Sequence, residues 1–356
     1  MDGTHLNNKI GIVGGGITGL ISAYFLSLEG YKVDLYEKKT LLSETSSKTT
    51  KLIHGGIRYL ENLQFHEVKN GINDRKWWLE NFPDETKLQE IIILSKKKLS
   101  PEIFKFFFGI KVYETFAGRS NIKTGRLYKQ DNLLSLGIKN NISAGISFYD
   151  GLMQESVGQE IIKRCKSNGV NFYENNEIKS IRSEGRIEEK QYKKIIIATG
   201  PWVSSFLKQN KIDTNKTIDY IKGSHLIINR KIKKGLMFRD QKKHRYIFAL
   251  PYQGNLLLGT TEQRVRSPED NHVLDSEVNY LLESINIYID RPINKDEIIK
   301  SYSGVRPLIK TKAQDFHSSS RDFYIQKDHN LLSLFGGKWT TAPSIARNIV
   351  RIVNNE

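Results

Sequence analysis

The chain has 356 residues, 38% of them hydrophobic and 26% charged, which allows one large core or two and is typical of two or three domains. Its single cysteine, Cys165, excludes a disulfide framework, a CxxC redox pair and a cysteine-rich zinc site, and fits a reducing compartment. The net charge of +16 favours contact with nucleic acid, anionic lipid or an acidic substrate, although a low-GC genome, which also enriches isoleucine and asparagine, imposes the same charge.

The N-terminal segment and the apolar runs bear on localisation. The first eight residues are polar and lead directly into a glycine-rich segment, leaving no room for a secretory signal peptide. The apolar runs at 91–94 and 106–110 are far too short to span a bilayer. We therefore expect a cytoplasmic chain, or one bound peripherally to the inner face of the cytoplasmic membrane.

Residues 9–39 have the pattern of a dinucleotide-binding unit. After a short β-rich run, three glycines follow at G-x-G-x-x-G spacing: Gly14, Gly16 and Gly19. A helix with an apolar face is predicted next, and a second strand ends at Glu37. In such units the glycines make the tight turn, admit the pyrophosphate and let helix and strand pack closely, while the acid accepts hydrogen bonds from ribose hydroxyls. The combination predicts dinucleotide binding far more strongly than the glycines alone.

The stretch 51–61, KLIHGGIRYLE, is too polar for a core strand. The adjacent Gly55 and Gly56 let a backbone come close to a flat ligand, and Arg58 carries a fork that suits a carboxylate or a phosphate. A solvated turn with a surface arginine is the alternative.

Two segments follow this stretch. Residues 62–82 are interpreted as a helix that Pro83 stops. The segment 100–118 interleaves phenylalanines with lysines, which fits either a core segment or an amphipathic surface that enters lipid headgroups.

The middle of the chain adds three further elements. A helix is predicted over 156–168, where an Asn-Gly pair closes it. A strand within 193–203 breaks at the Ala-Thr-Gly sequence of 198–200. The basic segment 229–245 is interpreted as a solvated hairpin region, with binding of anionic lipid as the alternative.

A third glycine loop bears on the identity of the cofactor. The strand predicted within 331–341 ends in Gly336 and Gly337, and a helix with Thr341 as its cap follows. Three such loops gather at the carboxyl edge of a doubly wound sheet, where ligands bind. The segment after Glu37 is rich in serine and threonine and does not form the next helix of a nicotinamide-binding half. We therefore predict noncovalently bound FAD rather than NAD.

Eight motifs, in their order and spacing, resemble the FAD-dependent glycerol-3-phosphate dehydrogenases, which are D-amino-acid-oxidase-like flavoproteins: GIVGGGITG, TSSKTTKLIHGGIRYLE, IATGPWV, IKGSHLIINR, LLLGTTE, YSGVRPL, SSRDFYI and LLSLFGGKWTT. The resemblance extends from about residue 8 to residue 345. It implies a combined α/β and α+β fold, with a Rossmann-like FAD-binding domain and an inserted mixed-sheet substrate domain. The implied FAD-binding domain comprises 1–61, 145–212 and 322–356, and the substrate domain comprises 62–144 and 213–321.

The resemblance also implies an activity. It predicts oxidation of glycerol 3-phosphate, or of a closely related phosphorylated polyol, to dihydroxyacetone phosphate by hydride transfer to flavin, with electrons passed to a quinone. His225 is the expected base, because imidazole titrates near working pH, and His54 is the runner-up, packed beside the flavin. Arg306 is expected to steady the alkoxide and the reduced flavin, and Lys338 to reach the substrate or the pyrimidine edge of the flavin.

The other implied site residues bind substrate or cofactor. Those for the substrate are the phosphate-clamping arginines Arg58 and Arg321 and the neutral donors Tyr59 and Thr260. Those for FAD are Gly14, Gly16, Ile17, Thr18, Gly19, Glu37, Ser46, Ser47, Leu52, His54, Gly55, Ala198, Thr199, Gly200, Gly336, Gly337, Lys338, Trp339 and Thr340.

Three departures from the family pattern leave alternatives open. Glu262 stands where the family usually has aspartate, and Glu155-Ser156-Val157 stands where Asp-Ala-Arg is expected. Because the chain ends at Glu356, we do not expect the C-terminal helical domain common in the family. The alternatives are an oxidase or dehydrogenase of another hydroxy acid or amino acid, and a flavin-retaining membrane or nucleic-acid binder without turnover. For the main prediction an anionic membrane surface is a candidate partner and nucleic acid is not.

Overall fold

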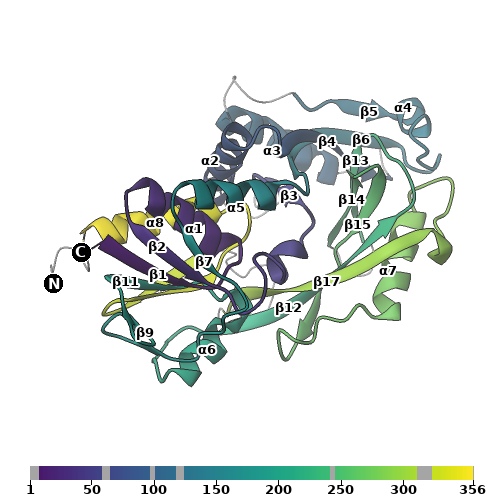
Figure 1. The fold of residues 1–356 in the computed structure, drawn as a ribbon. Helices are drawn as coiled ribbons and strands as arrows, with labels where there is room; N and C mark the ends of the chain where they lie inside the picture. The colour runs from purple at the N-terminus through teal and green to yellow at the C-terminus, as the bar shows by residue number, and fades with distance from the viewer. Residues whose placement is uncertain are drawn as a thin grey trace.

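The computed structural model describes residues 8–57, 65–96, 101–117, 124–240, 245–310 and 323–355. Two β-sheets, each with helices packed on it, dominate the fold (Figure 1). Two long paired strands, β12 (Ile218–Ile228) and β17 (Ile298–Ile309), run from the larger sheet toward the smaller one, and β17 contacts a strand of the smaller sheet.

The smaller sheet has six strands in the order β18-β19-β11-β1-β2-β7. They are β1 (Lys9–Val13), β2 (Lys32–Tyr36), β7 (Asn171–Tyr173), β11 (Lys194–Ile197), β18 (Phe323–Asp328) and β19 (Leu331–Gly336). All neighbours are parallel except the edge strand β18, which is antiparallel to β19. Ile12, Leu35 and Ile196 are fully buried in its centre, as expected of parallel strands covered on both faces.

Helices far apart in sequence cover one face of this sheet. They are α1 (Ile17–Leu28), α5 (Val157–Ser167) and α8 (Ala342–Asn355), and α1 packs against both of the others. The other face is covered by α6 (Val203–Gln209) and by a small sheet of β8 (Ile181–Arg182), β9 (Arg186–Ile187) and β10 (Lys190–Gln191). The helices predicted after the first glycine loop, over 156–168 and after Thr341 are therefore all present, and Gly30 follows α1 with a φ of 83°.

The larger sheet has ten strands and is mixed. Its main order is β16-β12-β15-β14-β13-β4-β6-β3, with β17 paired to β12 and β5 paired to β6. Among the strand pairs of this sheet that the described residues form, only β13 with β4 is parallel. The strands not yet delimited are β3 (Leu52–Ile53), β4 (Thr86–Ser95), β5 (Leu127–Lys129), β6 (Ala144–Met153), β13 (Gly235–Arg239), β14 (Tyr246–Tyr252), β15 (Asn255–Gly259) and β16 (Gln263–Val265).

Helices cover both faces of the larger sheet. On one face lie α2 (Phe65–Asn81) and α3 (Pro101–Ala117), and on the other lies α7 (Asp275–Asn286), while the short α4 (Gln130–Leu134) packs beside β5. Helix α2 ends two residues before Pro83, in agreement with the predicted stop. No helix within the described ranges is both long and apolar enough to cross a membrane.

The phenylalanine-rich segment forms α3, which has two different faces. Phe106, Ile110 and Tyr113 are buried against the larger sheet, which confirms the core interpretation for that face. Phe107 and Phe108 lie elsewhere on the helix and are 42% and 70% exposed.

The basic segment 229–245 was expected to be a solvated hairpin region, and that description is only partly right. Strands β13 and β14 do pair antiparallel. Lys234 and Arg230 form ion pairs with Glu90 and Glu297. Arg245 at the end of the segment is only 4% exposed, so the prediction of a solvated side chain is wrong there.

Two strands pair across the predicted domain boundaries. Most of β6 and all of β3 lie in segments assigned to the FAD-binding domain, yet both strands belong to the larger sheet. Strand β6 pairs with β4 over its whole length. The chain passes between the two sheets as often as the predicted boundaries imply, but its first stretch in the larger sheet begins before residue 62 and ends after residue 145, because β3 and β6 pair antiparallel at the edge of that sheet.

Candidate functional site

A cavity of about 610 Å³ lies between the two sheets. From the smaller sheet it is lined by the loops that follow β1, β2, β11 and β19. From the larger sheet it is lined by residues of β6, β12, β14 and β17. The predicted convergence of glycine loops at the carboxyl edge of a parallel sheet is therefore present in the structure.

The first glycine loop is held in place by close backbone packing. Gly14 has a φ of 112°, and a Cβ there would lie 2.4 Å from the carbonyl oxygen of Ala198. A Cβ on Gly19 would lie 2.0 Å from the carbonyl oxygen of Gly14. Gly16 occupies the N-cap of α1 and has no side chain of its own to cap the helix, whose first amide, that of Ile17, donates to Ser46 instead. The amide end of α1 therefore reaches the cavity wall, where it favours an anionic group such as a pyrophosphate.

Glu37 is fixed beside this loop. Its Oε2 atom accepts a hydrogen bond of 2.7 Å from the Gly15 amide, and Oε1 accepts one of 2.9 Å from the Lys39 amide. The carboxylate lines the cavity at the end of β2. A ribose placed beside the first glycine loop would meet an acceptor that is already oriented.

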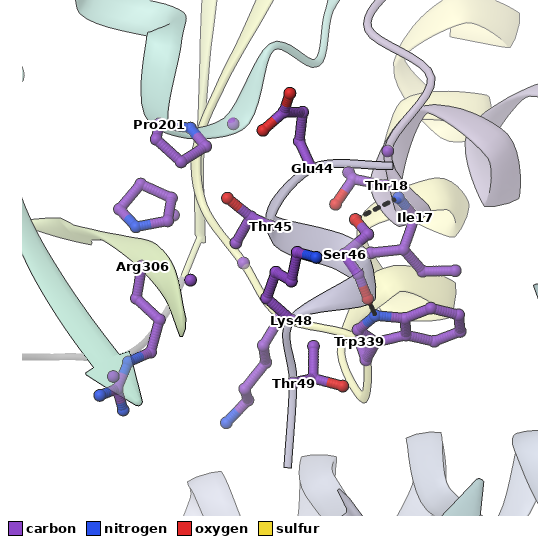
Figure 2. A pocket seen from close by; sticks show the side chains of 18 of the residues that line it. Ile17, Thr18, Glu44, Thr45, Ser46, Lys48, Thr49, Pro201, Arg306 and Trp339 are labelled. Atoms are coloured by element: carbon purple, nitrogen blue, oxygen red, sulfur yellow. Dashed lines mark hydrogen bonds between the residues drawn. The ribbon is translucent and has the colours of Figure 1, made fainter. Parts of the chain in front are cut away.

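Ser46 connects two of the loops, as Figure 2 shows. Its Oγ accepts a 3.0 Å hydrogen bond from the Ile17 amide, and its carbonyl oxygen accepts one of 2.8 Å from Trp339 Nε1. Lys48, in the same segment, also lines the cavity, and Arg306 lies across the pocket from Trp339 in this view. The serine-rich segment therefore closes one wall between α1 and the loop after β19.

Most of the predicted cofactor residues line the cavity. They are Gly14, Gly16, Ile17, Thr18, Glu37, Ser46, Leu52, His54, Ala198, Thr199, Gly200, Gly336, Gly337, Lys338, Trp339 and Thr340. Gly19, Ser47 and Gly55 do not. Gly19 packs α1 on its own loop, the Ser47 hydroxyl donates to backbone carbonyls of residues 43 and 44, and Gly55 packs against the protein interior. At the end of the cavity formed by the smaller sheet, the amide end of α1, the glycine loops and the Glu37 carboxylate fit an extended dinucleotide such as FAD.

His225 lies at the end of the cavity formed by the larger sheet. It is 3% exposed, stacks on Tyr302 with ring centroids 5.0 Å apart, and its Nε2 atom lies 2.9 Å from Thr50 Oγ1. Burial, reinforced by the cations Arg306, Lys51 and Arg245, lowers the pKa of His225 to about 3. The ring is therefore neutral near pH 7, which is the form that accepts a proton. The expectation that this imidazole titrates near working pH is wrong, because burial and the three cations disfavour its charged form, and so low a pKa makes it a weaker base.

Two arginines and Glu262 form an ionic cluster at the same end. Glu262 lies between them, with Oε1 3.5 Å from Arg306 Nη1 and Oε2 3.6 Å from Arg245 Nη1. Arg245 also donates a 2.6 Å hydrogen bond to the Thr260 carbonyl oxygen. Arg245, Arg306, Glu262 and Thr260 all line the cavity. Arg245 is not among the predicted site residues, because its segment reads as a surface hairpin.

The structure does not test the predicted phosphate clamp. Arg58, Tyr59 and Arg321 lie outside the described residues. Ile57, which directly precedes Arg58, lines the cavity. Lys338 also lines it, and its amide donates a 3.1 Å hydrogen bond to Thr341 Oγ1 at the start of α8.

Several cavity residues carry no motif that would identify them from the sequence. Phe148, Tyr246 and Phe248 form an aromatic wall on β6 and β14, and Asp150 lies beside them. Their alternation along strands is the signal of a half-buried sheet, which does not say whether a face meets a core or a ligand.

Comparison with known proteins gives one family. The sequence model of the family described as "DAO: FAD dependent oxidoreductase" matches residues 9–352. The glycerol-3-phosphate dehydrogenase of Pseudomonas tolaasii is 28% identical over 95% of this chain and 70% of its own length. The aerobic glycerol-3-phosphate dehydrogenase of Staphylococcus saprophyticus is 30% identical over 96% of this chain and 66% of its own length. The chain thus spans about two thirds of the length of these curated relatives.

A solved structure shares the fold. The L-alpha-glycerophosphate oxidase of Mycoplasma pneumoniae, solved with FAD bound, superposes with a TM-score of 0.77 at 20% identity. The match covers 97% of this chain and 94% of the oxidase chain. The two-sheet architecture predicted from the sequence motifs is therefore confirmed.

Proposed function

The chain belongs to the FAD dependent oxidoreductase family, and from this premise we propose that it oxidises glycerol 3-phosphate, or a closely related phosphorylated polyol, to dihydroxyacetone phosphate. The observation that carries the proposal is the composition of the cavity. Dinucleotide-binding loops line one end, and a neutral histidine with two arginines lines the other. The curated relatives carry the name glycerol-3-phosphate dehydrogenase, which supports the same substrate.

Oxidising a secondary alcohol needs a hydride acceptor, a base and cations. FAD, when bound, supplies the hydride acceptor. His225 is the base in this proposal, because its neutral ring lines the cavity. Its Nε2 atom lies 2.9 Å from Thr50 Oγ1, so a substrate hydroxyl that passes its proton to Nε2 would have to take the place of Thr50. Arg306 stabilises the negative charge that develops on the substrate oxygen, and Lys338 lies in the wall that follows β19.

The phosphate requires cations at a distance from the reacting carbon. We assign Arg58 and Arg321 to it, with Tyr59 and Thr260 as neutral donors. Arginine suits this task because its planar fork makes two parallel hydrogen bonds to one phosphate. Arg58 directly follows a residue of the cavity wall, which supports its assignment.

An anaerobic experiment tests the substrate. Mixing the purified protein with glycerol 3-phosphate without oxygen should bleach the flavin absorbance, and glycerol, which lacks the phosphate, should not bleach it. If a hydroxy acid or an amino acid bleaches the flavin instead, the phosphate assignment is wrong, and Glu262 with residues 155–157 becomes the place to look for specificity.

The electron acceptor is a separate part of the proposal. We propose a quinone as the acceptor, with molecular oxygen as the alternative that an oxidase of the same fold would use. Reoxidising the bleached protein with a soluble quinone analogue and, separately, with dissolved oxygen compares the two. Rapid reoxidation by oxygen alone would replace the dehydrogenase assignment with an oxidase.

We also propose that the protein binds peripherally to an anionic membrane through α3. Phe107 and Phe108 are exposed on this helix, and the chain carries a charge of +16. Aromatic side chains enter the headgroup region, and each basic residue near an anionic surface contributes about 1 kcal/mol.

Flotation with liposomes tests this surface. The protein should float with anionic liposomes at low salt and not with neutral ones, and Phe108→Ser should weaken flotation. Ile299→Ser, which changes a 58% exposed residue on β17, is the matched control. If Phe108→Ser floats as well as the parent does, α3 is not the contact; if the parent itself does not float, genome composition explains the charge.

A further inference from the structure

A buried cluster of three polar side chains lies beneath the loop 54–57. It comprises Arg75 of α2, Tyr113 of α3 and Asp150 of β6, which are 3%, 1% and 2% exposed. Apolar residues of both helices and of the larger sheet surround it. Buried charges of this kind are costly unless they are paired, so their presence here requires an explanation.

The three side chains bond to one another. Arg75 Nη1 donates to Tyr113 Oη at 2.7 Å and to Asp150 Oδ1 at 3.2 Å. Tyr113 Oη donates to the same carboxylate oxygen at 3.1 Å. Burial raises the pKa of the Tyr113 phenol well above its usual range, so that the hydroxyl stays protonated and remains a donor.

A third donor to this oxygen comes from the loop. The Gly55 amide donates a 2.9 Å hydrogen bond to Asp150 Oδ1. The backbone of Gly55 is also packed closely on both helices. A Cβ on Gly55 would lie 2.1 Å from Tyr113 Oη, and a Cβ on Gly71 of α2 would lie 2.8 Å from the Gly55 carbonyl oxygen. The loop is thus held from behind by α2, α3 and β6 together.

The other side of the loop is the cavity wall. His54, Gly56 and Ile57 line the cavity, whereas Gly55 between them does not. Asp150 lines it as well. The cluster therefore touches the one residue of this loop that turns inward, while its neighbours form the surface that a bound flavin would meet.

We propose that Arg75, Tyr113 and Asp150 are positioning residues that fix the loop 54–57 relative to FAD. Asp150 supplies the acceptor for Gly55, and Tyr113 sets the depth of the loop. Burial raises the pKa of the Asp150 carboxyl, and the neighbouring Arg75 opposes that rise. The inference rests on FAD binding and not on the identity of the substrate.

Three sets of variants separate positioning from mere structural support. Asp150→Asn leaves Arg75 without its counterion. A triple variant, Arg75→Met with Tyr113→Phe and Asp150→Leu, removes every charge of the cluster, a replacement that is often neutral for stability. Glu297→Gln is the control, because it breaks the ion pair with Arg230, which lies outside the cavity wall.

The readouts are Tm, the Kd for FAD of the apoprotein measured by flavin fluorescence, and the midpoint potential of the bound flavin. Asp150→Asn should lower Tm and weaken FAD binding by about tenfold or more, the scale of a lost hydrogen bond to a charged group. The triple variant should recover Tm while FAD binding stays weak and the potential stays shifted, because the Gly55 amide has lost its acceptor. Glu297→Gln should lower Tm only.

Two results would overturn the inference. One is a triple variant with the parent Kd and the parent potential, which would make the cluster a packing element only. If the triple variant does not fold, Tyr113→Phe decides, because it removes a single oxygen atom. The proposal requires a shifted flavin spectrum in Tyr113→Phe, and the parent spectrum together with the parent Kd would contradict it. None of these readouts depends on glycerol 3-phosphate, so they remain informative if the proposed substrate is wrong.

Discussion

The low pKa of His225 links the candidate base to the stability of the fold. Burial holds this pKa at about 3 in the folded chain, against about 6.5 for a free histidine. Between these two values the unfolded chain binds a proton that the folded chain does not. The free energy of unfolding therefore rises with pH between about pH 3 and pH 6.5. As the pH falls below 6.5, this contribution is lost by up to about 1.4 kcal/mol per pH unit.

Thermal unfolding at different pH values checks this linkage. The parent protein should lose more Tm between pH 7 and pH 5 than His225→Gln does, because glutamine keeps a polar side chain but has no proton to bind. Parallel Tm curves for the two proteins would show that His225 does not carry the pH dependence.

Removing the base should change the rate of flavin bleaching, whereas removing part of the phosphate clamp should change the affinity for the substrate. His225→Ala should keep the affinity for glycerol 3-phosphate and slow flavin bleaching by about a hundredfold or more, the usual contribution of a general base. Arg58→Ala should instead weaken binding by roughly 2 to 5 kcal/mol, or roughly thirtyfold to several thousandfold. Stopped-flow bleaching at varied substrate concentration separates the rate from the affinity, and Arg230→Ala, outside the cavity wall, is the control. A change in affinity alone for His225→Ala would remove it from the role of base.

At the level of elements, α1 lies so close to its own glycine loop that no side chain fits at Gly19. Gly19→Ala places a methyl group 2.0 Å from the Gly14 carbonyl oxygen, so α1 must move away from the loop. Overpacking of this kind costs typically 1 to 3 kcal/mol, and we expect the purified variant to contain little or no FAD.

Gly30→Asn is the matched control for this change. Gly30 follows the other end of α1, its φ of 83° suits asparagine, and nothing lies within 4 Å of the added Cβ. The ratio of flavin to protein absorbance after purification gives the FAD content. Full FAD content in Gly19→Ala would show that α1 can shift without opening the pyrophosphate site.

The elements also show where prediction from the sequence succeeds and where it stops. The glycine loop with Gly14 and Gly19 is local, so its spacing predicts strand, turn, helix and cofactor together. Arg245 and Asp150 enter the cavity through strand pairings between distant segments, and a basic or apolar strand does not reveal its partner. The pairing of β6 with β4 is missed at the predicted domain boundary for the same reason.

On the scale of the whole molecule, FAD would contact segments that lie far apart in the chain. The cavity is lined by both sheets, so the bound cofactor should stabilise both. At a concentration of FAD one hundred times its Kd, binding only to the folded state contributes about 2.7 kcal/mol.

Removal of the cofactor tests this prediction. The purified protein should be yellow, acid precipitation should release free FAD, and the apoprotein should unfold at a lower temperature. Adding FAD back should restore Tm in a concentration-dependent manner. A Tm that does not respond to FAD, or a colourless protein that binds NADH, would contradict the assignment of the cofactor site.

The strand order of the smaller sheet also determines at which point of its synthesis the chain can complete this sheet. Strand β1 pairs with β11, and β11 pairs with β19, so neighbours in space are separated by the long stretches from Val13 to Lys194 and from Ile197 to Leu331. While the ribosome is still translating the middle of the sequence, the edge of β11 that later receives β19 has no partner. Helix α1 likewise lacks α8, which packs on it. The nascent chain therefore exposes an apolar strand edge and an apolar helix face until residues 331–353 emerge, and the length of that interval sets how long these surfaces can aggregate.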